Sequence, residues 1–326
     1  NLKLRIESLE KEKKIKNEKN FKKKKKKDKI LVTGAAGFIG HKICNELLKK
    51  NYQVIGVDDL SSGKKENIAK GIKFYNLDLS RKKNLNKIPK CNYIFHLAGQ
   101  SSGDKSFDDP YKDLEKNTAT TLNLIDFSIK KRCKKIIYAS SMSVYGESKK
   151  KNVSENDFLE PTSCYGVSKL SSENYLRIFS KKINYVIFRM FNVYGPGQNL
   201  KDLNQGMVSI YLAQFLKNKK IKVKGSLNRI RDFIFIDDVV EIWIKSLNDK
   251  IINQTFNLGT GIGTKVSKLL SLITSYKNIK ILPPTRGDQK IIISNNRKLK
   301  KFFKKVKFTN IKVGIPKFLM HEKKRY

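Results

Sequence analysis

The stretch ILVTGAAGFIG, residues 30–40, decides the fold of this chain. Its first four residues have the pattern of a buried strand, and residues 41–50 follow with apolar side chains at helical spacing. Glycines in a turn between a strand and a helix let the backbone approach a pyrophosphate, which the helix N-terminus attracts with unpaired N–H groups. We therefore expect a dinucleotide-binding turn formed by Gly34, Gly37, Phe38, Ile39 and Gly40.

Acidic residues after the next two strand patterns indicate which dinucleotide is bound. Asp58 and Asp59 follow the strand pattern 53–57, where a carboxylate accepts hydrogen bonds from the adenosine ribose. Such a carboxylate favours NAD, because it would repel the 2′-phosphate of NADP. A helix cap or a turn is the alternative role for this pair. Asp78, at the end of the following strand, is placed to reach the adenine, with Leu79 beside it.

Short apolar runs alternate with longer amphipathic stretches over the first half of the chain. The strand patterns are 30–33, 53–57, 73–75, 93–97, 135–139 and 185–189. Such alternation implies β-α-β units, so we predict an α/β fold with a doubly wound parallel sheet of the Rossmann type. Past Asn192 the alternation ends, and a helix at 207–216 and a strand at 221–224 are expected in a smaller lobe.

These patterns divide the chain into three parts. Residues 1–28 are basic and poor in apolar side chains, so they predict a disordered or marginally helical tail. Residues 29–190 form the expected NAD-binding domain, to which residues 236–256 return, and residues 191–326 form a smaller C-terminal lobe for substrate binding.

The net charge of +41, from 70 Lys and Arg against 29 Asp and Glu, would also suit a nucleic-acid binder. The excess is mostly lysine spread over every segment, and no nucleic-acid recognition motif accompanies it, so we expect no specific nucleic-acid partner. No apolar run is long enough for a membrane span, and the 4 cysteines are scattered without metal-ligand spacing. A soluble, cytoplasmic protein without membrane insertion or metal is therefore expected.

Three residues form a candidate catalytic group. Tyr165 and Lys169 stand four apart, hence on one face of a probable helix, where the ammonium lies near the phenol. A phenol with a pKa of about 10 is a poor base, and the Lys charge together with an oxidised nicotinamide would lower this pKa. Ser141 follows the strand pattern 135–139, at the strand end where such sheets bind ligands. We expect Ser141 to hydrogen-bond the reacting hydroxyl and Tyr165 to exchange its proton.

In these segments the chain resembles the extended short-chain dehydrogenase/reductase family, and within it the nucleotide-sugar epimerases typified by UDP-glucose 4-epimerase. The matching segments are TGAAGFIG at 33–40, VDDLSSG at 57–63, HLAG at 96–99, SSMSVYG at 140–146, YGVSK at 165–169, RMFNVYGPG at 189–197, RDFIFIDDV at 231–239 and NLGTG at 257–261. The resemblance implies catalytic roles for Ser141, Tyr165 and Lys169. It implies positions near NAD for Asp58, Asp78, Leu97, Ala98 and Asn117. It implies that Asn192, Arg231 and Arg286 hold the nucleotide diphosphate, and that helices near 111–131 and 165–181 pair in a homodimer.

The loop after Ser141 separates the branches of this family. Dehydratases carry an Asp-Glu pair where this chain has Met142-Ser143, and decarboxylases carry a Glu in place of Ser143. Without these carboxylates, transient oxidation is the simplest chemistry. The sequence thus predicts epimerisation at C4 of a UDP-hexose through a 4-keto intermediate, with NAD retained as a prosthetic group. The alternatives are a nucleotide-sugar reductase or dehydrogenase that consumes NAD(P)(H), and, more remotely, an RNA- or partner-binding protein on the same fold.

Overall fold

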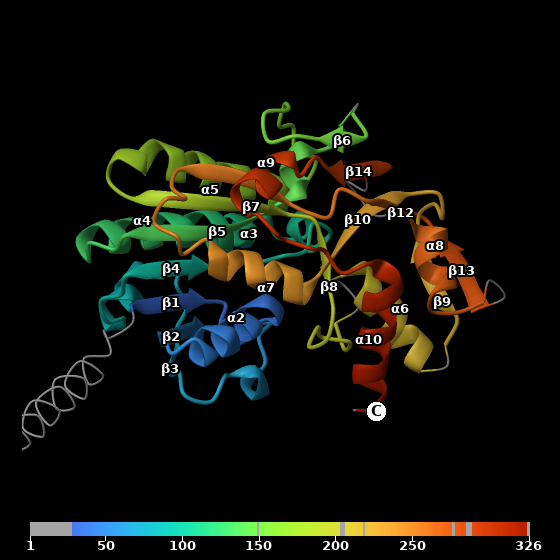
Figure 1. Ribbon diagram of the computed structural model, residues 1–326, viewed down its shortest axis with the longest axis horizontal. Coiled ribbons are helices and arrows are strands. Elements are labelled where there is room, and N and C mark those ends of the chain that lie inside the picture. Colours follow the sequence, from blue (N-terminus) through green and yellow to red (C-terminus); the bar gives the residue numbers. More distant parts are fainter. Residues whose placement is uncertain are drawn as a thin grey trace, which may run out of the picture.

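A parallel sheet of 7 strands forms the centre of the larger lobe, on the left in Figure 1. The computed structural model describes residues 28–148, 150–202, 206–217, 219–275, 278–284 and 289–324, so the expected tail lies outside the described residues except for Asp28. The strand order is β11-β7-β5-β4-β1-β2-β3, and every neighbouring pair is parallel. Its strands are β1 Lys29–Thr33, β2 Gln53–Asp58, β3 Lys73–Asn76, β4 Tyr93–His96, β5 Lys135–Ser141, β7 Asn184–Met190 and β11 Gln254–Leu258. The prediction of a doubly wound α/β fold is confirmed.

Helices cover both faces of this sheet because its strands are apolar on both sides. In β1, Ile30 and Val32 point into one core and Leu31 into the other, and all three are fully buried. The helices around the sheet are α2 Phe38–Lys49, α3 Pro110–Leu114, η4 Glu115–Ala119, α4 Thr120–Lys130, α5 Cys164–Ile178 and α7 Ile236–Lys245. The short 3-10 turns are η1 Lys65–Asn67, η2 Lys82–Lys87, η3 Lys105–Phe107, η5 Met142–Tyr145 and η6 Phe179–Lys181. Helices α2 and α7 pack on one face, and α4 and α5 pack on the other.

The second lobe is built around a smaller mixed sheet (Figure 1). Strand β10 pairs with β12, β14 and β8, and β14 also pairs with β6, which comes from the first half of the chain. The strands of the lobe are β6 Asn152–Val153, β8 Asn192–Tyr194, β9 Ile221–Lys224, β10 Ile230–Phe235, β12 Gly263–Lys265, β13 Ile279–Leu282 and β14 Ile291–Ser294. Its helices are α6 Met207–Leu216, α8 Val266–Ser271, α9 Arg297–Phe302 and α10 Ile311–Lys323. The expected helix 207–216 and strand 221–224 are both present with these bounds.

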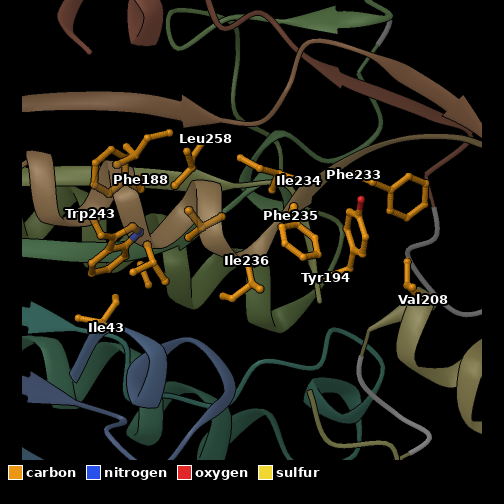
Figure 2. Packing of buried hydrophobic residues seen from close by; sticks show 14 of the residues in the cluster. Ile43, Phe188, Tyr194, Val208, Phe233, Ile234, Phe235, Ile236, Trp243 and Leu258 are labelled. Carbon is orange, nitrogen blue, oxygen red and sulfur yellow. The ribbon is translucent and has the colours of Figure 1, made fainter. Parts of the chain in front are cut away.

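One apolar core joins the two lobes (Figure 2). Trp243 on α7 is fully buried, and its ring centroid lies 5.4 Å from that of Phe95 and 5.5 Å from that of Phe188. Along the same core, Phe235 packs edge-on to Tyr194 at 5.5 Å. Helix α7 and strand β11 thus return the chain to the large sheet after it has formed β8 and α6. This return holds the second lobe against the carboxyl ends of the parallel strands.

Two central strands are longer than the sequence pattern predicts. Strand β5 continues through Ser140 and Ser141, which pair with Arg189 and Met190 of β7. Polar side chains usually mark the end of a buried strand, but here their burial is compensated. Arg189 forms a buried ion pair with Glu173 at 2.8 Å, and Ser140 donates a hydrogen bond to the same carboxylate. Ser141 is therefore the last residue of a strand and not a residue of the following loop.

We predict that Trp243→Ala lowers the free energy of unfolding by about 3 to 5 kcal/mol, because it removes a fully buried aromatic ring and leaves a cavity. Urea titration monitored by circular dichroism measures the change. Phe158→Ala is the control: this ring is 81% exposed, and its loss should change stability by less than about 0.5 kcal/mol. Equal effects of the two substitutions would contradict the core position of Trp243.

Candidate functional site

Three backbone segments meet closely at the glycine turn. Gly34 has a φ of +69°, and a Cβ atom there would lie 2.9 Å from the Ala98 nitrogen after β4. A Cβ atom on Gly40 would collide with the carbonyl oxygen of Gly34, so the first turn of α2 packs directly on the loop. The N-cap residue of α2, Gly37, makes no side-chain cap. The geometry is that of a pyrophosphate cradle at a helix N-terminus.

A cavity of about 620 Å³ opens beside this turn, at the carboxyl ends of the parallel strands. It lies where the strand order reverses between β1 and β4, the expected ligand position in a doubly wound sheet. Its lining includes most of the site residues predicted from the sequence: Gly34, Gly37, Phe38, Ile39, Gly40, Asp58, Asp78, Leu79, Leu97, Ala98, Tyr165 and Lys169. Asn117, Ser141, Asn192 and Arg231 are not among its lining residues, and Arg286 lies outside the described part of the chain.

Asp58 is buried where β2 ends, and it holds the turn together. Its Oδ2 accepts a hydrogen bond from the Ala36 N–H at 2.9 Å, and its Oδ1 accepts one from the Leu60 N–H at 2.9 Å. Burial raises the pKa of Asp58, although these two hydrogen bonds oppose the shift. The carboxylate therefore plays the turn role that was the alternative, and it also lines the cavity. A ribose hydroxyl can still donate to it, because each oxygen has a second lone pair.

Between α3 and α4 the chain places an amide against Gly99, one of the lining residues of the cavity. Asn117 lies in η4, a π-helical turn between α3 and α4, and it is 1% exposed. Among the described residues its Oδ1 has no hydrogen-bond partner. A Cβ atom on Gly99, whose φ is +151°, would collide with this oxygen. A buried acceptor without a partner beside a glycine cradle fits the nicotinamide end of a dinucleotide, so the residues present suit NAD.

Helix α5 and strand β5 bring the predicted catalytic residues together. Ser163 caps α5 by accepting a hydrogen bond from the Gly166 N–H at 3.1 Å, which places Tyr165 in the first turn. The Lys169 ammonium lies 5.6 Å from the Tyr165 ring centroid and donates to the Ala139 carbonyl at 3.0 Å. Ser141 stands at the end of β5, and its Oγ accepts a hydrogen bond from the Ser143 N–H at 3.1 Å. A tyrosine, a lysine and a serine thus converge at one edge of the sheet.

Burial shifts the pKa values of this group in opposite directions. It raises the pKa of Tyr165 to about 12, against a hydrogen bond with Ser141 that lowers it. It lowers the pKa of Lys169 to about 8, against the charge of Asp113, which raises it. The protein side of the site therefore raises the pKa of Tyr165, the opposite of the direction predicted from the sequence. That prediction also counted the positive charge of an oxidised nicotinamide, which favours the phenolate.

The two residues expected to hold the nucleotide diphosphate lie on paired strands of the second lobe. Asn192 begins β8, and its Nδ2 donates to the Asp232 carbonyl at 3.0 Å. Arg231 belongs to β10, is 3% exposed and donates to the Ile230 carbonyl at 3.0 Å and the Lys290 carbonyl at 3.3 Å. The sequence pattern indicated no strand here, because the charged pair Arg231-Asp232 interrupts the apolar run.

Asp232, the neighbour of Arg231 on β10, is held by residues from other segments of the lobe. In the structure the Asp232 carboxylate is fully buried and accepts hydrogen bonds from the Thr260 N–H at 2.9 Å and the Ser294 hydroxyl at 2.5 Å. The Ser294 hydroxyl thus compensates part of the charge of a buried carboxylate.

Sequence reasoning missed two charged residues near the cavity. Asp113 of α3 is 1% exposed, and its Oδ1 accepts hydrogen bonds from Gln100 at 2.9 Å and from Asn117 at 3.1 Å. Lys116 of η4 lies 2.9 Å from Asp59 and 3.0 Å from Asp78. Their spacing from Asn117, four residues and one residue before it, was the available signal, but their partners Gln100, Asp59 and Asp78 come from other segments that this spacing does not mark.

The histidine that ends β4 has a structural environment. His96 is buried between Thr33 and Thr121, each with its hydroxyl 3.0 Å from a ring nitrogen, and burial lowers the pKa of His96 to about 3. It is therefore neutral at physiological pH. Within the described residues, no cluster of His, Cys, Asp or Glu could hold a metal ion. A search of the same residues finds no helix long and apolar enough to cross a membrane.

The fold and this site define a class of protein: a dinucleotide-dependent enzyme of the short-chain dehydrogenase type, with a Ser-Tyr-Lys group at the strand ends. The profile of the NAD dependent epimerase/dehydratase family matches residues 30–259, and the chain belongs to this family. The resemblance inferred from the sequence and the expectation of NAD as cofactor are thereby confirmed.

Three proteins that are similar to this chain are UDP-glucose 4-epimerases. UDP-glucose 4-epimerase of Mycolicibacterium smegmatis is 32% identical over 272 residues, which cover 79% of this chain and 87% of that protein. The structure of UDP-glucose 4-epimerase with UDP-glucose from Thermotoga maritima superposes with a TM-score of 0.87 at 33% identity and covers 91% of this chain and 99% of that one. The Thermus thermophilus UDP-glucose 4-epimerase complex with NAD gives 0.83 at 28% identity, covering 90% and 99%.

We predict that Gly34→Ala abolishes NAD retention while Gly71→Ala does not. Both glycines have positive φ, +69° and +99°, so both substitutions introduce backbone strain. Only the Gly34 variant also forces Cβ against the Ala98 backbone, because at Gly71 the nearest atom would be Leu48 Cδ1 at 3.8 Å. NAD released by acid from dialysed protein measures retention. Equal retention in both variants would show that the close approach at Gly34 is not needed.

Proposed function

We propose that this enzyme epimerises a nucleotide-diphosphate sugar, inverting C4 of a UDP-hexose through a transient 4-keto intermediate. The observation that carries the proposal is the assembly of Ser141, Tyr165 and Lys169 at the strand ends beside a dinucleotide cradle. The similarity to UDP-glucose 4-epimerases over nearly the whole of their length supports the substrate class.

The roles of the three residues follow from their chemistry. When bound, NAD would accept the hydride from C4 of the sugar and give it back on the other face of the ring. Tyr165, as phenolate, removes the proton of the C4 hydroxyl, and the Ser141 hydroxyl hydrogen-bonds the sugar oxygen during this transfer. The Lys169 ammonium, held by the Ala139 carbonyl, stabilises the phenolate. After the keto sugar turns over, Tyr165 returns the proton to the same oxygen, so the sugar gains and loses nothing overall.

The loop after Ser141 favours epimerisation over elimination. Met142 and Ser143 occupy η5, directly after the strand that ends in Ser141. Their side chains offer no carboxyl group that could remove a ring proton or protonate a departing hydroxyl. A nucleotide-sugar reductase or dehydrogenase needs only the same three residues, so it remains the second candidate, and the consumption of cofactor distinguishes it.

We propose that one lobe binds NAD and the other binds the sugar nucleotide, as the sequence suggested. Residues 29–190, with 236–256, form the NAD-binding domain, supported by α7 and β11 on the large sheet. Residues 191–326 bind the sugar nucleotide, and Asn192 and Arg231 contact the diphosphate there, together with Arg286. The four cysteines Cys44, Cys91, Cys133 and Cys164 are free thiols. They are compatible with the proposed cytoplasmic location.

A homodimer formed through the α3 and α5 faces is part of the proposal. Tyr111 and Leu114 on α3 are 79% and 50% exposed, and Val167 and Ile178 on α5 are 54% and 70% exposed. Helices α3 and α5 pack against each other, so these apolar side chains belong to neighbouring surfaces. Large apolar residues gathered on adjacent exposed helices are typical of a protein interface.

Purified enzyme without added cofactor should interconvert UDP-glucose and UDP-galactose, followed by NMR, and Tyr165→Phe should reduce the rate at least about 100-fold, because general acid–base catalysis is lost. UDP-N-acetylglucosamine, UDP-N-acetylgalactosamine and UDP-glucuronate are tested in parallel to identify the sugar. Conversion that requires added NAD or NADH in stoichiometric amounts would reject the epimerase and favour the reductase or dehydrogenase.

The wild-type chain should elute as a dimer in size-exclusion chromatography with light scattering, and the double variant Leu114→Glu, Ile178→Glu should elute as a monomer. Burying two introduced carboxylates in an apolar interface is costly, which is the physical reason. Ile262→Glu, at a position 61% exposed outside α3 and α5, is the control and should remain dimeric. A monomeric wild type would refute the interface.

A further inference from the structure

Lys116 connects two loops at the adenosine end of the cavity. Its ammonium lies 2.9 Å from Asp59 Oδ2, after β2, and 3.0 Å from Asp78 Oδ2, after β3. The lysine side chain is 21% exposed and the two carboxylates are 25% and 26% exposed, so the three groups are partly shielded from water. All three residues line the cavity.

Each carboxylate uses its other oxygen to hold its own loop. Asp59 Oδ1 accepts hydrogen bonds from the N–H and hydroxyl of Ser61, at 3.0 and 2.5 Å. Asp78 Oδ1 accepts the corresponding bonds from Ser80, at 3.0 and 2.7 Å. Lys116 is therefore the group that ties these two pre-formed loops to each other and to the helix of η4.

The three charges depend on one another. Burial would raise the pKa of Asp59 and of Asp78, but hydrogen bonds from the serines and from Lys116 outweigh it, so both pKa values lie below the ordinary value. Burial would lower the pKa of Lys116, but the two carboxylates raise it above the ordinary value. Without the ammonium, Asp59 would lose this ion pair and Asp78 would keep the longer one of 3.7 Å with the exposed Arg81, so negative charge would increase beside the place of an anionic pyrophosphate.

Consecutive residues of η4 serve several parts of the site. Lys116 reaches Asp59 and Asp78, Asn117 lies against Gly99, and the Thr118 hydroxyl donates to the Ser168 carbonyl of helix α5 at 3.1 Å. Consecutive helical residues point about 100° apart, so three in a row contact three different neighbours.

We propose that Lys116 is the residue that retains NAD at its adenosine half, by holding the Asp59 and Asp78 loops in their binding positions and neutralising part of their charge. It is a positioning residue and takes no part in the chemistry at the sugar. The inference rests on NAD as the cofactor and not on which sugar is the substrate.

The test compares Lys116→Met, Lys116→Arg and Lys130→Met by calorimetric titration of cofactor-free protein with NAD and with ADP-ribose. Lys130 is the matched control, because it forms an exposed ion pair with Asp126 on α4, 3.0 Å long, with its side chain 65% exposed. The melting temperature of each cofactor-free variant is also measured, because it would fall if Lys116 only stabilised the fold.

For Lys116→Met we expect about tenfold or more weaker binding of both NAD and ADP-ribose, the size of one charge-assisted hydrogen bond. Lys116→Arg should recover most of the affinity, and Lys130→Met should bind like the wild type, with all melting temperatures similar. Unchanged NAD binding in Lys116→Met would overturn the proposal. Weaker binding of NAD with unchanged binding of ADP-ribose would also overturn it. The same holds for weaker binding accompanied by a lower melting temperature of the cofactor-free variant. Failure of the epimerase assay leaves these binding results unaffected.

Discussion

The close approach of the α2 N-terminus and the end of β4 to the Gly34 turn is the constraint on which the rest of the site depends. A side chain at Gly34 or Gly40 would meet backbone atoms, so only glycine lets the three segments converge. Because β1 lies between β2 and β4, this turn stands where the strand order reverses. The carboxylates after β2 and β3, the amide in η4 and the serine at the end of β5 are all positioned around it.

Burial sets the chemistry of the catalytic group. Lys169 is 4% exposed, and desolvation favours the neutral forms of both it and Tyr165. For Lys169, the hydrogen bond to the Ala139 carbonyl and the charge of Asp113 favour the ammonium. For Tyr165, the hydrogen bond with Ser141 opposes desolvation, whereas the charge of Asp113 adds to it. Tyr165 is therefore not a ready base through protein groups alone, and the charge of the oxidised cofactor is one of the influences that favour its phenolate. The strength of Tyr165 as a base therefore depends on whether the bound cofactor is oxidised or reduced.

Local pattern was sufficient for elements that are apolar and regular. Six of the 7 strands of the large sheet, the helix 207–216 and the strand 221–224 were predicted with small errors at their ends, whereas β11 was not predicted as a strand. Pattern failed where polar residues continue or interrupt a strand, because their compensation comes from distant partners: Glu173 for Ser140, and Thr260 and Ser294 for Asp232. The pairing of β6 with β14 had no local signal, since it joins residues far apart in the chain.

The sequence by itself determined the glycine turn, the acidic residues after β2 and β3, and the Tyr165-Lys169 spacing, because each of these depends on neighbours within one or two turns of chain. Only the tertiary structure decided that Lys116 bridges Asp59 and Asp78, that Arg231 lies within a strand, and that burial raises the pKa of Tyr165. Those properties depend on which segments meet and on how much water they exclude, and a linear sequence records neither.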